Sequence, residues 1–333
     1  MAFTIAFFGS KPYDEDSFSE KNKDYGFELR FYKGHLNKNN VILTKGVGAA
    51  CIFVNDTANE EVLRTMAENG VKLLALRCAG FNNVDLKAAA AYGITVVRVP
   101  AYSPYAVAEY TVALMLSLNR KIPRATWRTR DGNFSLHGLL GFDMYGKTAG
   151  IIGTGKIAKK LICILRGFGM NILAYDLYPD YNFAREHQVV YTSLDELYHS
   201  SDIISLHCPL TEQTKYLIND YSISKMKDGV MIINTGRGQL IHTNALIEGL
   251  KNKKIGSAGL DVYEEEGDYF YEDQSDRIID DDTLARLLSF NNVIVTSHQA
   301  FFTREALANI ATTTLQNIKD FTLQKPLENE VKI

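Results

Sequence analysis

The chain has 333 residues, an apolar fraction of 46% and a formal net charge of −3. This length allows two domains of ordinary size, and the apolar fraction is sufficient to fill two cores. The small net charge and the lack of a Lys/Arg-rich tract argue against nucleic-acid binding, and no apolar run approaches the ~18–20 residues that span a bilayer.

Cysteine usage and the first residues favour a reduced, cytoplasmic setting. The cysteines Cys51, Cys78, Cys163 and Cys208 are widely spaced, and none pairs in C-x-x-C spacing, so neither a zinc site nor a disulfide framework is indicated. The opening residues MAFTIAFF lack a basic segment and a long apolar core, and they predict a β-strand instead of a signal peptide. We expect a cytoplasmic protein that binds neither a membrane nor a metal ion.

The amino-terminal part of the chain alternates short apolar runs with helical patterns. These patterns predict strands at Ile5–Phe8, Ala50–Val54, Leu73–Leu76 and Thr95–Val97, and helices at Glu60–Asn69 and Asp85–Tyr92. Such alternation is typical of a parallel sheet that helices cover on both faces.

A helix then joins this part to the next. Ser103 is a good N-cap residue and Pro104 suits the first helical position, so a helix is predicted to begin there. Its apolar pattern continues to about Lys121 and breaks before Pro123. We expect this helix to link two domains.

A second series of alternating elements follows. It predicts a helix from Lys159 to Phe168 and strands at Thr148–Ile152, Ile172–Tyr175, Val189–Tyr191, Ile203–His207, Val230–Asn234, Ser257–Val262 and Val293–Thr296. The two series together predict an α/β protein with two doubly wound parallel-sheet domains.

Two segments near the carboxyl end complete the pattern. Residues 264–282 hold ten acidic residues and one arginine, which indicates a solvated loop. The stretch Arg304 to Leu323 is strongly helical and must pack on one of the two domains. A return to the first domain would make that domain discontinuous, and the pattern alone leaves this open.

The clearest chemical signature is the sequence IIGTGKIA at 151–158. Gly153 permits a tight turn, Gly155 lets the backbone approach a pyrophosphate, and Ala158 is small enough for helix-on-sheet packing. Asp176 stands 21 residues after Gly155, at the end of the next predicted strand, where it can accept hydrogen bonds from ribose hydroxyls and repel a 2′-phosphate. The spacing predicts that NAD binds in preference to NADP.

Polar residues after three later strands suit a second substrate. Arg237 lies between two glycines after the strand Val230–Asn234, where a guanidinium can hold a carboxylate through two parallel hydrogen bonds. His298 follows the last predicted strand, and an imidazole can give a proton to a ketone or take one from an alcohol. A neighbouring carboxylate would favour the imidazolium and orient the ring, and the residues alone leave open which of the glutamates at 264–266 does so.

At this point the chain resembles the D-isomer-specific 2-hydroxyacid dehydrogenase family, and within it the bacterial fermentative D-lactate dehydrogenases. The resemblance rests on RCAGFNNVD at 77–85, RVPAYSP at 98–104, YGKTAGIIGTGK at 145–156, HCPLT at 207–211, NTGRG at 234–238, GLDVYE at 259–264 and HQAF at 298–301, in the family's order. It implies a Rossmann NAD-binding domain at 103–298 and a discontinuous, flavodoxin-like substrate domain formed by 1–102 and 299–333. It also implies a homo-oligomer, either a dimer or a tetramer.

The resemblance implies reversible NADH-dependent reduction of pyruvate to D-lactate, with Arg237, Glu266 and His298 as catalytic residues. Arg237 would hold the substrate carboxylate, His298 would protonate the keto oxygen, and Glu266, from the family pattern D-x-Y-E-x-E, would hold His298 protonated. Further substrate contacts are implied at Ala79, Gly80, Tyr102 and Phe301. Cofactor contacts are implied at Gly153, Thr154, Gly155, Lys156, Ile157, Asp176, Cys208, Pro209, Thr214, Thr235, Gly236, Arg237 and Asp261.

Two alternatives stay open. Tyr102 and Phe301 suggest a small pocket that favours pyruvate over 2-ketoisocaproate or phenylpyruvate, although one methylene changes discrimination by only about 1–3 kcal/mol. An NAD(H)-sensing interaction protein could also use this fold, because fold alone does not determine function. The presence of Arg237, Glu266 and His298 together favours an enzyme.

Overall fold

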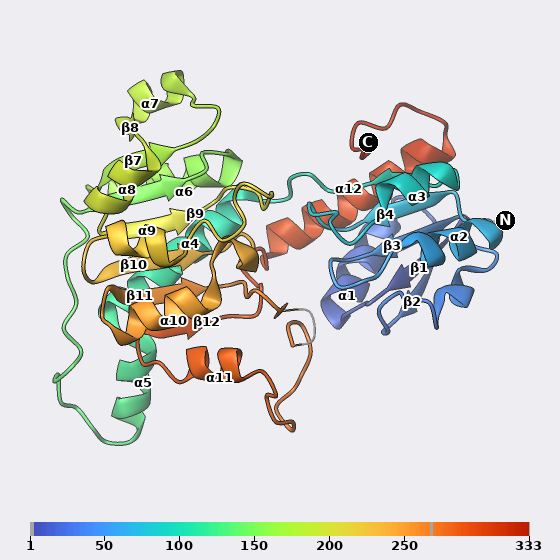
Figure 1. Cartoon of the computed structure of the whole chain (residues 1–333). Coiled ribbons are helices and arrows are strands. Elements are labelled where there is room, and N and C mark those ends of the chain that lie inside the picture. Colours follow the sequence, from blue (N-terminus) through green and yellow to red (C-terminus); the bar gives the residue numbers. More distant parts are fainter. Residues whose placement is uncertain (1–2, 267–268, 333) are drawn as a thin grey trace. The chain divides into compact units, whose positions relative to one another are not determined.

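The computed structural model describes residues 3–266 and 269–332, and the chain divides into two compact units (Figure 1). The first unit comprises Met1–Ser103 together with Phe302–Ile333, and the second comprises Pro104–Phe301. The second unit therefore ends at Phe301, slightly beyond the predicted boundary, and the N–H groups of Gln299 and Ala300 donate to Asp261 at the end of one of its own strands.

The first unit is built on a five-stranded parallel sheet of order β2-β1-β3-β4-β5. Its strands are β1 (Thr4–Phe8), β2 (Glu28–Tyr32), β3 (Ala49–Ile52), β4 (Leu73–Leu76) and β5 (Thr95–Val97). Its helices are α1 (Pro12–Asn22), α2 (Glu60–Glu68), α3 (Leu86–Ala91) and α12 (Arg304–Thr322), with a 3₁₀ turn η1 (Val41–Thr44). This strand order is that of flavodoxin-like folds. Helix α12 contacts α1 and β4, which places the carboxy-terminal helix on the amino-terminal sheet.

The second unit is built on a seven-stranded parallel sheet of order β12-β11-β10-β9-β6-β7-β8. Its strands are β6 (Thr148–Ile152), β7 (Asn171–Tyr175), β8 (Val189–Tyr191), β9 (Ile203–Leu206), β10 (Val230–Asn234), β11 (Ile255–Leu260) and β12 (Val293–Val295). Its helices are α4 (Pro104–Arg120), α5 (Ile122–Arg130), α6 (Lys156–Gly167), α7 (Tyr181–His187), α8 (Leu194–Ser200), α9 (Asp220–Lys225), α10 (Thr243–Lys251) and α11 (Asp282–Leu288), with a 3₁₀ turn η2 (Gly238–Leu240). The strand order reverses between β6 and β9, as in Rossmann folds.

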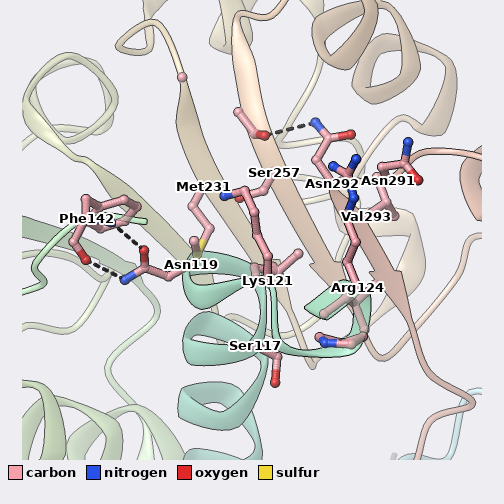
Figure 2. Close-up of a pocket in the computed structure, with 15 residues that line it drawn as sticks. Ser117, Asn119, Lys121, Arg124, Phe142, Met231, Ser257, Asn291, Asn292 and Val293 are labelled. Atoms are coloured by element: carbon pink, nitrogen blue, oxygen red, sulfur yellow. Dashed lines mark hydrogen bonds between the residues drawn. The ribbon is translucent and has the colours of Figure 1, made fainter. Parts of the chain in front are cut away.

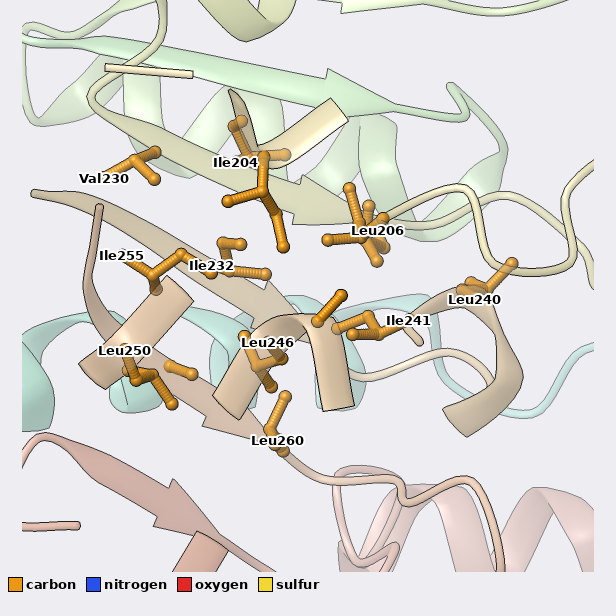
Figure 3. Close-up of a cluster of buried hydrophobic side chains, with 14 of the residues drawn as sticks. Ile204, Leu206, Val230, Ile232, Leu240, Ile241, Leu246, Leu250, Ile255 and Leu260 are labelled. Atoms are coloured by element: carbon orange, nitrogen blue, oxygen red, sulfur yellow. The ribbon is translucent and has the colours of Figure 1, made fainter. Parts of the chain in front are cut away.

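Two apolar cores form on the seven-stranded sheet because successive side chains of a strand point to opposite faces. Ile204 and Ile232 contribute to one core, where they lie with Leu246 of α10 (Figure 3). Their neighbours Ile203 and Ile233 contribute to the other core, which includes α4 and α6. Burial on both faces explains why these strands are continuous apolar runs in the sequence.

The hydrophobic pattern of the sequence does not predict helix α1 or strand β2 of the first unit. Helix α1 buries only Asp14 and Phe18, so its apolar periodicity is too weak to predict a helix. Strand β2 is an edge strand whose residues are exposed or half-buried, and it therefore lacks the apolar run that marks the central strands.

The break predicted before Pro123 separates two helices. Lys121 adopts a left-handed conformation with φ of 51°, which ends α4. Helix α5 begins immediately afterwards with Pro123 in its first turn, where proline's missing N–H has no consequence. The proline therefore lies in the first turn of a second helix, α5, which the sequence pattern did not predict.

The structure can be searched for disulfide bonds, metal sites and membrane-spanning helices. Cys51, Cys78, Cys163 and Cys208 are all free thiols. Within residues 3–266 and 269–332, no three His, Cys, Asp or Glu side chains are arranged to hold a metal ion. In the same ranges, no helix combines the length and the apolarity needed to cross a membrane.

Candidate active site

The glycine turn joins β6 to α6 at the point where the strand order reverses. Gly153 has φ of 89°, and a Cβ at this position would lie 2.5 Å from the backbone nitrogen of Cys208. Only glycine fits, because the left-handed backbone and the close approach of the loop after β9 both exclude a side chain. The turn is therefore fixed by the sheet itself.

Gly155 occupies a different environment. It is the N-cap of α6, and no side chain caps the first turn, which contains Lys156 and Ile157. A Cβ on Gly155 would meet no atom within 4 Å. The first N–H groups of a helix lack intrahelical partners and form the positive end of the helix dipole, so this open cradle fits a pyrophosphate.

Asp176 lies at the end of β7 and is held by the glycine turn. Its Oδ2 accepts hydrogen bonds from the backbone N–H of Thr154 at 2.6 Å and from the Thr154 hydroxyl at 2.9 Å. Its Oδ1 accepts one from the backbone N–H of Tyr178 at 2.8 Å. Partial burial raises the pKa of the Asp176 carboxyl, but the bonds from Tyr178 and Thr154 outweigh it, and the pKa lies below its ordinary value. The carboxylate is thus ionised and oriented beside the cradle.

The loop after β9 carries the predicted cofactor contacts Cys208, Pro209 and Thr214. The Thr214 hydroxyl donates to the carbonyl of Pro209 at 2.6 Å, which closes the loop on itself. Burial raises the pKa of the Cys208 thiol to about 11, so the thiol stays protonated. Burial also lowers the pKa of His207 to about 4, and its Nε2 lies 2.8 Å from the Ser205 hydroxyl. The imidazole of His207 is therefore neutral near pH ~7.

A buried asparagine fixes the backbone of the loop after β10, which carries Arg237. Asn234 is fully buried; its Oδ1 accepts a hydrogen bond from the N–H of Gly236 at 3.0 Å, and its Nδ2 donates to the carbonyl of Arg237 at 2.9 Å. A Cβ on Gly238 would lie 1.9 Å from the carbonyl oxygen of Tyr263, so glycine is required there as well. The sequence motif at 234–238 contains Asn234 but assigns it no role, whereas its burial at the end of β10 reveals one.

The side chains of His298 and Glu266 are in contact at the candidate site. The Nδ1 of His298 lies 3.0 Å from Oε1 of Glu266, and the two side chains are 17% and 23% exposed, so both remain reachable. The second oxygen of Glu266 accepts a hydrogen bond from the N–H of Tyr263 at 3.3 Å. With Nδ1 donating to the carboxylate, Nε2 is the ring nitrogen that can exchange a proton with a substrate.

The geometry also resolves which glutamate pairs with the histidine. Glu264 accepts hydrogen bonds from the Tyr216 hydroxyl and, at 2.7 Å, from the Thr243 hydroxyl at the start of α10. Burial raises the pKa of Glu264, but the bonds from Tyr216 and Thr243 outweigh it and lower the pKa overall. Glu264 therefore anchors α10, and Glu266 is the glutamate that contacts His298.

Asp261, at the end of β11, holds the loop that carries His298. Its carboxylate accepts hydrogen bonds from the Thr296 hydroxyl at 2.6 Å and from the N–H groups of Gln299 and Ala300 at 2.9 and 2.8 Å. Its carbonyl accepts the N–H of His298 at 2.7 Å, and His298 has a left-handed φ of 52°. Burial raises the pKa of the Asp261 carboxyl, against these hydrogen bonds. Asp261 thus positions the histidine, and its contact with the cofactor stays a prediction.

The predicted substrate residues are divided between the two units. In the first unit, Ala79 and Gly80 follow β4, and the guanidinium of Arg98 donates to the carbonyl of Ala79 at 2.8 Å. The contacts of Ala79 and Gly80 with the substrate stay a prediction. Tyr102 is half-buried in the same unit, whereas Phe301 is buried in the second unit.

The candidate residues of the second unit share one edge of its sheet. They follow β6, β7, β9, β10, β11 and β12, and the carboxyl ends of parallel strands lie at a common edge. Thr235, in the loop after β10, is buried with its hydroxyl 3.1 Å from that of Thr111 on α4. The structure thus brings the cradle, Arg237 and the His298–Glu266 pair to the edge where ligands of such sheets bind.

A pocket of about 280 Å³ lies at the opposite, amino-terminal edge of the same strands (Figure 2). Its lining includes Asn119 and Lys121 at the end of α4, together with Gly229, Ser257 and Asn292 at or near the starts of three strands. The Asn119 amide pairs with the backbone of Phe142, and the Lys121 ammonium donates to the carbonyl of Leu140. These polar groups are satisfied by the chain itself, and the predicted site residues lie elsewhere.

Comparison with known proteins agrees with this geometry. The model of the D-isomer specific 2-hydroxyacid dehydrogenase NAD binding domain matches residues 112–300. A 2-hydroxyacid dehydrogenase homolog of Haemophilus influenzae is 54% identical, with 98% of each chain covered. The D-lactate dehydrogenase of Escherichia coli is 52% identical, with 98% of this chain and 99% of that protein covered. A solved structure of the pyruvate reductase of Chlamydomonas reinhardtii is 44% identical with a TM-score of 0.93, and 98% of each chain is covered. The chain belongs to the D-isomer specific 2-hydroxyacid dehydrogenase family, and its second unit is the NAD-binding domain.

Proposed function

We propose that this protein catalyses the reversible, NADH-dependent reduction of pyruvate to D-lactate. The observation that carries the proposal is the His298–Glu266 pair, with 3.0 Å between Nδ1 and Oε1, at the sheet edge that also holds the cofactor cradle and Arg237. The identity to the Escherichia coli D-lactate dehydrogenase over nearly the full length supports pyruvate as the substrate.

The residues divide the reaction between binding and proton transfer. When bound, NADH supplies the hydride that reduces the keto carbon. The Arg237 guanidinium binds the substrate carboxylate through parallel hydrogen bonds, which fixes the orientation of the keto group. His298 gives the proton on Nε2 to the keto oxygen, while Glu266 holds the ring through Nδ1. In the reverse direction, Nε2 accepts the proton of the hydroxyl group.

A substrate panel with one matched pair of variants tests this proposal. NADH oxidation is followed with pyruvate, 2-ketobutyrate, 2-ketoisocaproate and phenylpyruvate, and the chirality of the product is determined. Pyruvate should give the highest kcat/KM, and D-lactate should accumulate. His298→Gln should abolish turnover while NADH still binds, whereas His199→Gln, which changes an exposed histidine on α8, should change neither.

Three results would contradict parts of the proposal. A higher kcat/KM for a bulky keto acid would replace pyruvate as the substrate and leave the mechanism standing. Near-normal turnover by His298→Gln would refute its acid–base role. Binding of NADH without turnover of any keto acid would favour a sensor, and Arg237→Ala should then leave NADH-dependent partner binding intact.

The proposal includes a homo-oligomer in the cytoplasm. Helix α5 has no buried residue, and α5 and the segment after it expose apolar side chains: Ile122, Trp127, Phe134, Leu136 and Leu140. Such a run of exposed apolar residues is typical of an interaction surface, here for a second copy of the chain. Light scattering should give a multiple of the monomer mass, and Leu140→Glu should lower it more than Ile278→Glu, a control at an equally exposed position. A monomer mass for the unmodified protein would refute this assembly.

A further inference from the structure

A second group of hydrogen bonds lies behind the Asp176 carboxylate. The hydroxyl of Tyr191, at the end of the edge strand β8, lies 2.9 Å from the Thr154 hydroxyl. The same phenol oxygen accepts a hydrogen bond from the backbone N–H of Asp180 at 3.1 Å. The Thr154 hydroxyl in turn donates to Asp176 Oδ2 at 2.9 Å. These four residues form one continuous chain of hydrogen bonds.

The chemistry of the two end groups determines which atom donates in each of these hydrogen bonds. The backbone N–H of Asp180 can only donate, and the ionised carboxylate of Asp176 can only accept. The Tyr191 hydroxyl must therefore donate its proton to Thr154, and the Thr154 hydroxyl must donate to Asp176. Each hydroxyl that accepts one bond becomes a better donor in the next, so the effect of Tyr191 extends to the carboxylate.

The donor end of the chain is itself held in place. Asp180 caps α7, where its Oδ1 accepts the N–H of Phe183 at 3.1 Å. Its Oδ2 pairs with the ammonium of Lys159 on α6 at 2.5 Å. The network therefore connects the helix that follows the glycine turn with the edge strand and with the end of β7.

The acceptor end leaves the carboxylate little freedom. Oδ2 of Asp176 accepts both bonds from Thr154, and Oδ1 accepts the N–H of Tyr178 at 2.8 Å. A carboxylate held at both oxygens cannot rotate away from a ligand without breaking hydrogen bonds. A 2′-phosphate would then meet a fixed negative charge, whereas ribose hydroxyls would meet an acceptor already in place.

We propose that Tyr191 is a positioning residue for cofactor selectivity, which acts through Thr154 to hold Asp176 against NADPH. This inference rests on the proposed role of Asp176 at the ribose. Tyr191 itself need not contact the cofactor, and its removal acts on the carboxylate through one intervening hydroxyl.

The test uses Tyr191→Phe, which removes the hydroxyl and keeps the ring. The dissociation constant of NADH should rise about three- to tenfold, the equivalent of one hydrogen bond, and the ratio of kcat/KM for NADPH to that for NADH should rise by a similar factor. The kcat at saturating NADH should stay unchanged. The matched control is Tyr181→Phe, which alters an exposed tyrosine whose ring packs edge-on against Tyr191 and should leave every value unchanged.

A double variant separates the inference from the function on which it rests. If Tyr191 acts through Asp176, Tyr191→Phe should have no further effect on the cofactor ratio in an Asp176→Ala background. An additive effect there, or an unchanged ratio in Tyr191→Phe alone while Asp176→Ala shifts it, would overturn the role of Tyr191 only. An unchanged ratio in Asp176→Ala would overturn the ribose role of Asp176 and the inference together.

Discussion

The two glycines of the cofactor turn should respond differently to the same substitution. A Cβ at Gly153 would lie 2.5 Å from the nitrogen of Cys208, on a backbone with φ of 89°. A Cβ at Gly155 would meet nothing within 4 Å, on an extended backbone with φ of −68° and ψ of −171° that any residue adopts. We therefore predict that Gly153→Ala damages the fold and that Gly155→Ala damages cofactor binding alone.

The magnitudes follow from these environments. At Gly153, a left-handed alanine costs about 1–2 kcal/mol, and the overpacking against the loop after β9 adds about 1–3 kcal/mol. Their sum, about 2–5 kcal/mol, is a large part of a typical free energy of unfolding of about 5–15 kcal/mol. At Gly155, alanine restricts the unfolded chain and should raise the free energy of unfolding by about 0.4–1 kcal/mol. The same methyl group enters the open cradle, where it should weaken NADH binding more than about tenfold, or ~1.4 kcal/mol.

Urea unfolding and NADH fluorescence titration measure the two effects separately. Gly167→Ala is the matched control, because Gly167 ends the same helix and its Cβ would also meet open space. This control should gain a similar free energy of unfolding and retain its NADH affinity. The reasoning fails if Gly155→Ala binds NADH normally, or if it lowers the free energy of unfolding as much as Gly153→Ala does.

Three further predictions concern acidic and titrating groups. Asp176→Ala should weaken NADH binding and raise the NADPH-to-NADH ratio of kcat/KM; an unchanged ratio would remove it from the ribose. Asp261→Asn should lower the free energy of unfolding by about 1–3 kcal/mol in urea, because an amide cannot accept all the bonds from Thr296, Gln299 and Ala300 that the carboxylate accepts. His207 has its pKa lowered from 6.5 to about 4, so the unfolded chain binds more protons between these values and stability should fall as pH falls through this window. His207→Gln should flatten that pH dependence, and an unchanged slope would contradict it.

Sequence patterns predicted the central strands well because those strands are apolar on both faces. β4, β6 and β10 match their predicted bounds, whereas β11 begins and ends two residues earlier than predicted. Gly256, which lies against the backbone of Gly229, interrupts the apolar pattern at the start of this strand. Helix α1 was missed because most of its residues are polar and only Asp14 and Phe18 are buried. Strand β2 was missed because it is a short edge strand in which no residue is fully buried. Neither failure affects the strand ends that carry the site.

For the site, glycine spacing and strand ends were sufficient to locate the cradle, Asp176, Arg237 and His298. They were insufficient to select Glu266 from three consecutive glutamates, because that choice depends on how the loop after β11 folds. The structure makes the choice through Tyr263, whose N–H holds Glu266. The resemblance to a family anticipated this glutamate, whereas composition and spacing did not.

The roles that the sequence did not predict share a physical reason: Asp261 was expected only as a cofactor contact, and Asn234 and Tyr191 were given no role. Asn234, Asp261 and Tyr191 shape or orient site loops from behind, through hydrogen bonds to backbone or to another hydroxyl. In sequence, a polar residue at the end of a strand resembles any loop residue, and only its burial distinguishes it. Because a buried polar group must find partners within the protein, each such residue fixes the loop that satisfies it. Polar side chains behind the site therefore set the shape of the loops at this sheet edge. Substitutions of these side chains should alter selectivity or turnover even where the side chain contacts no ligand.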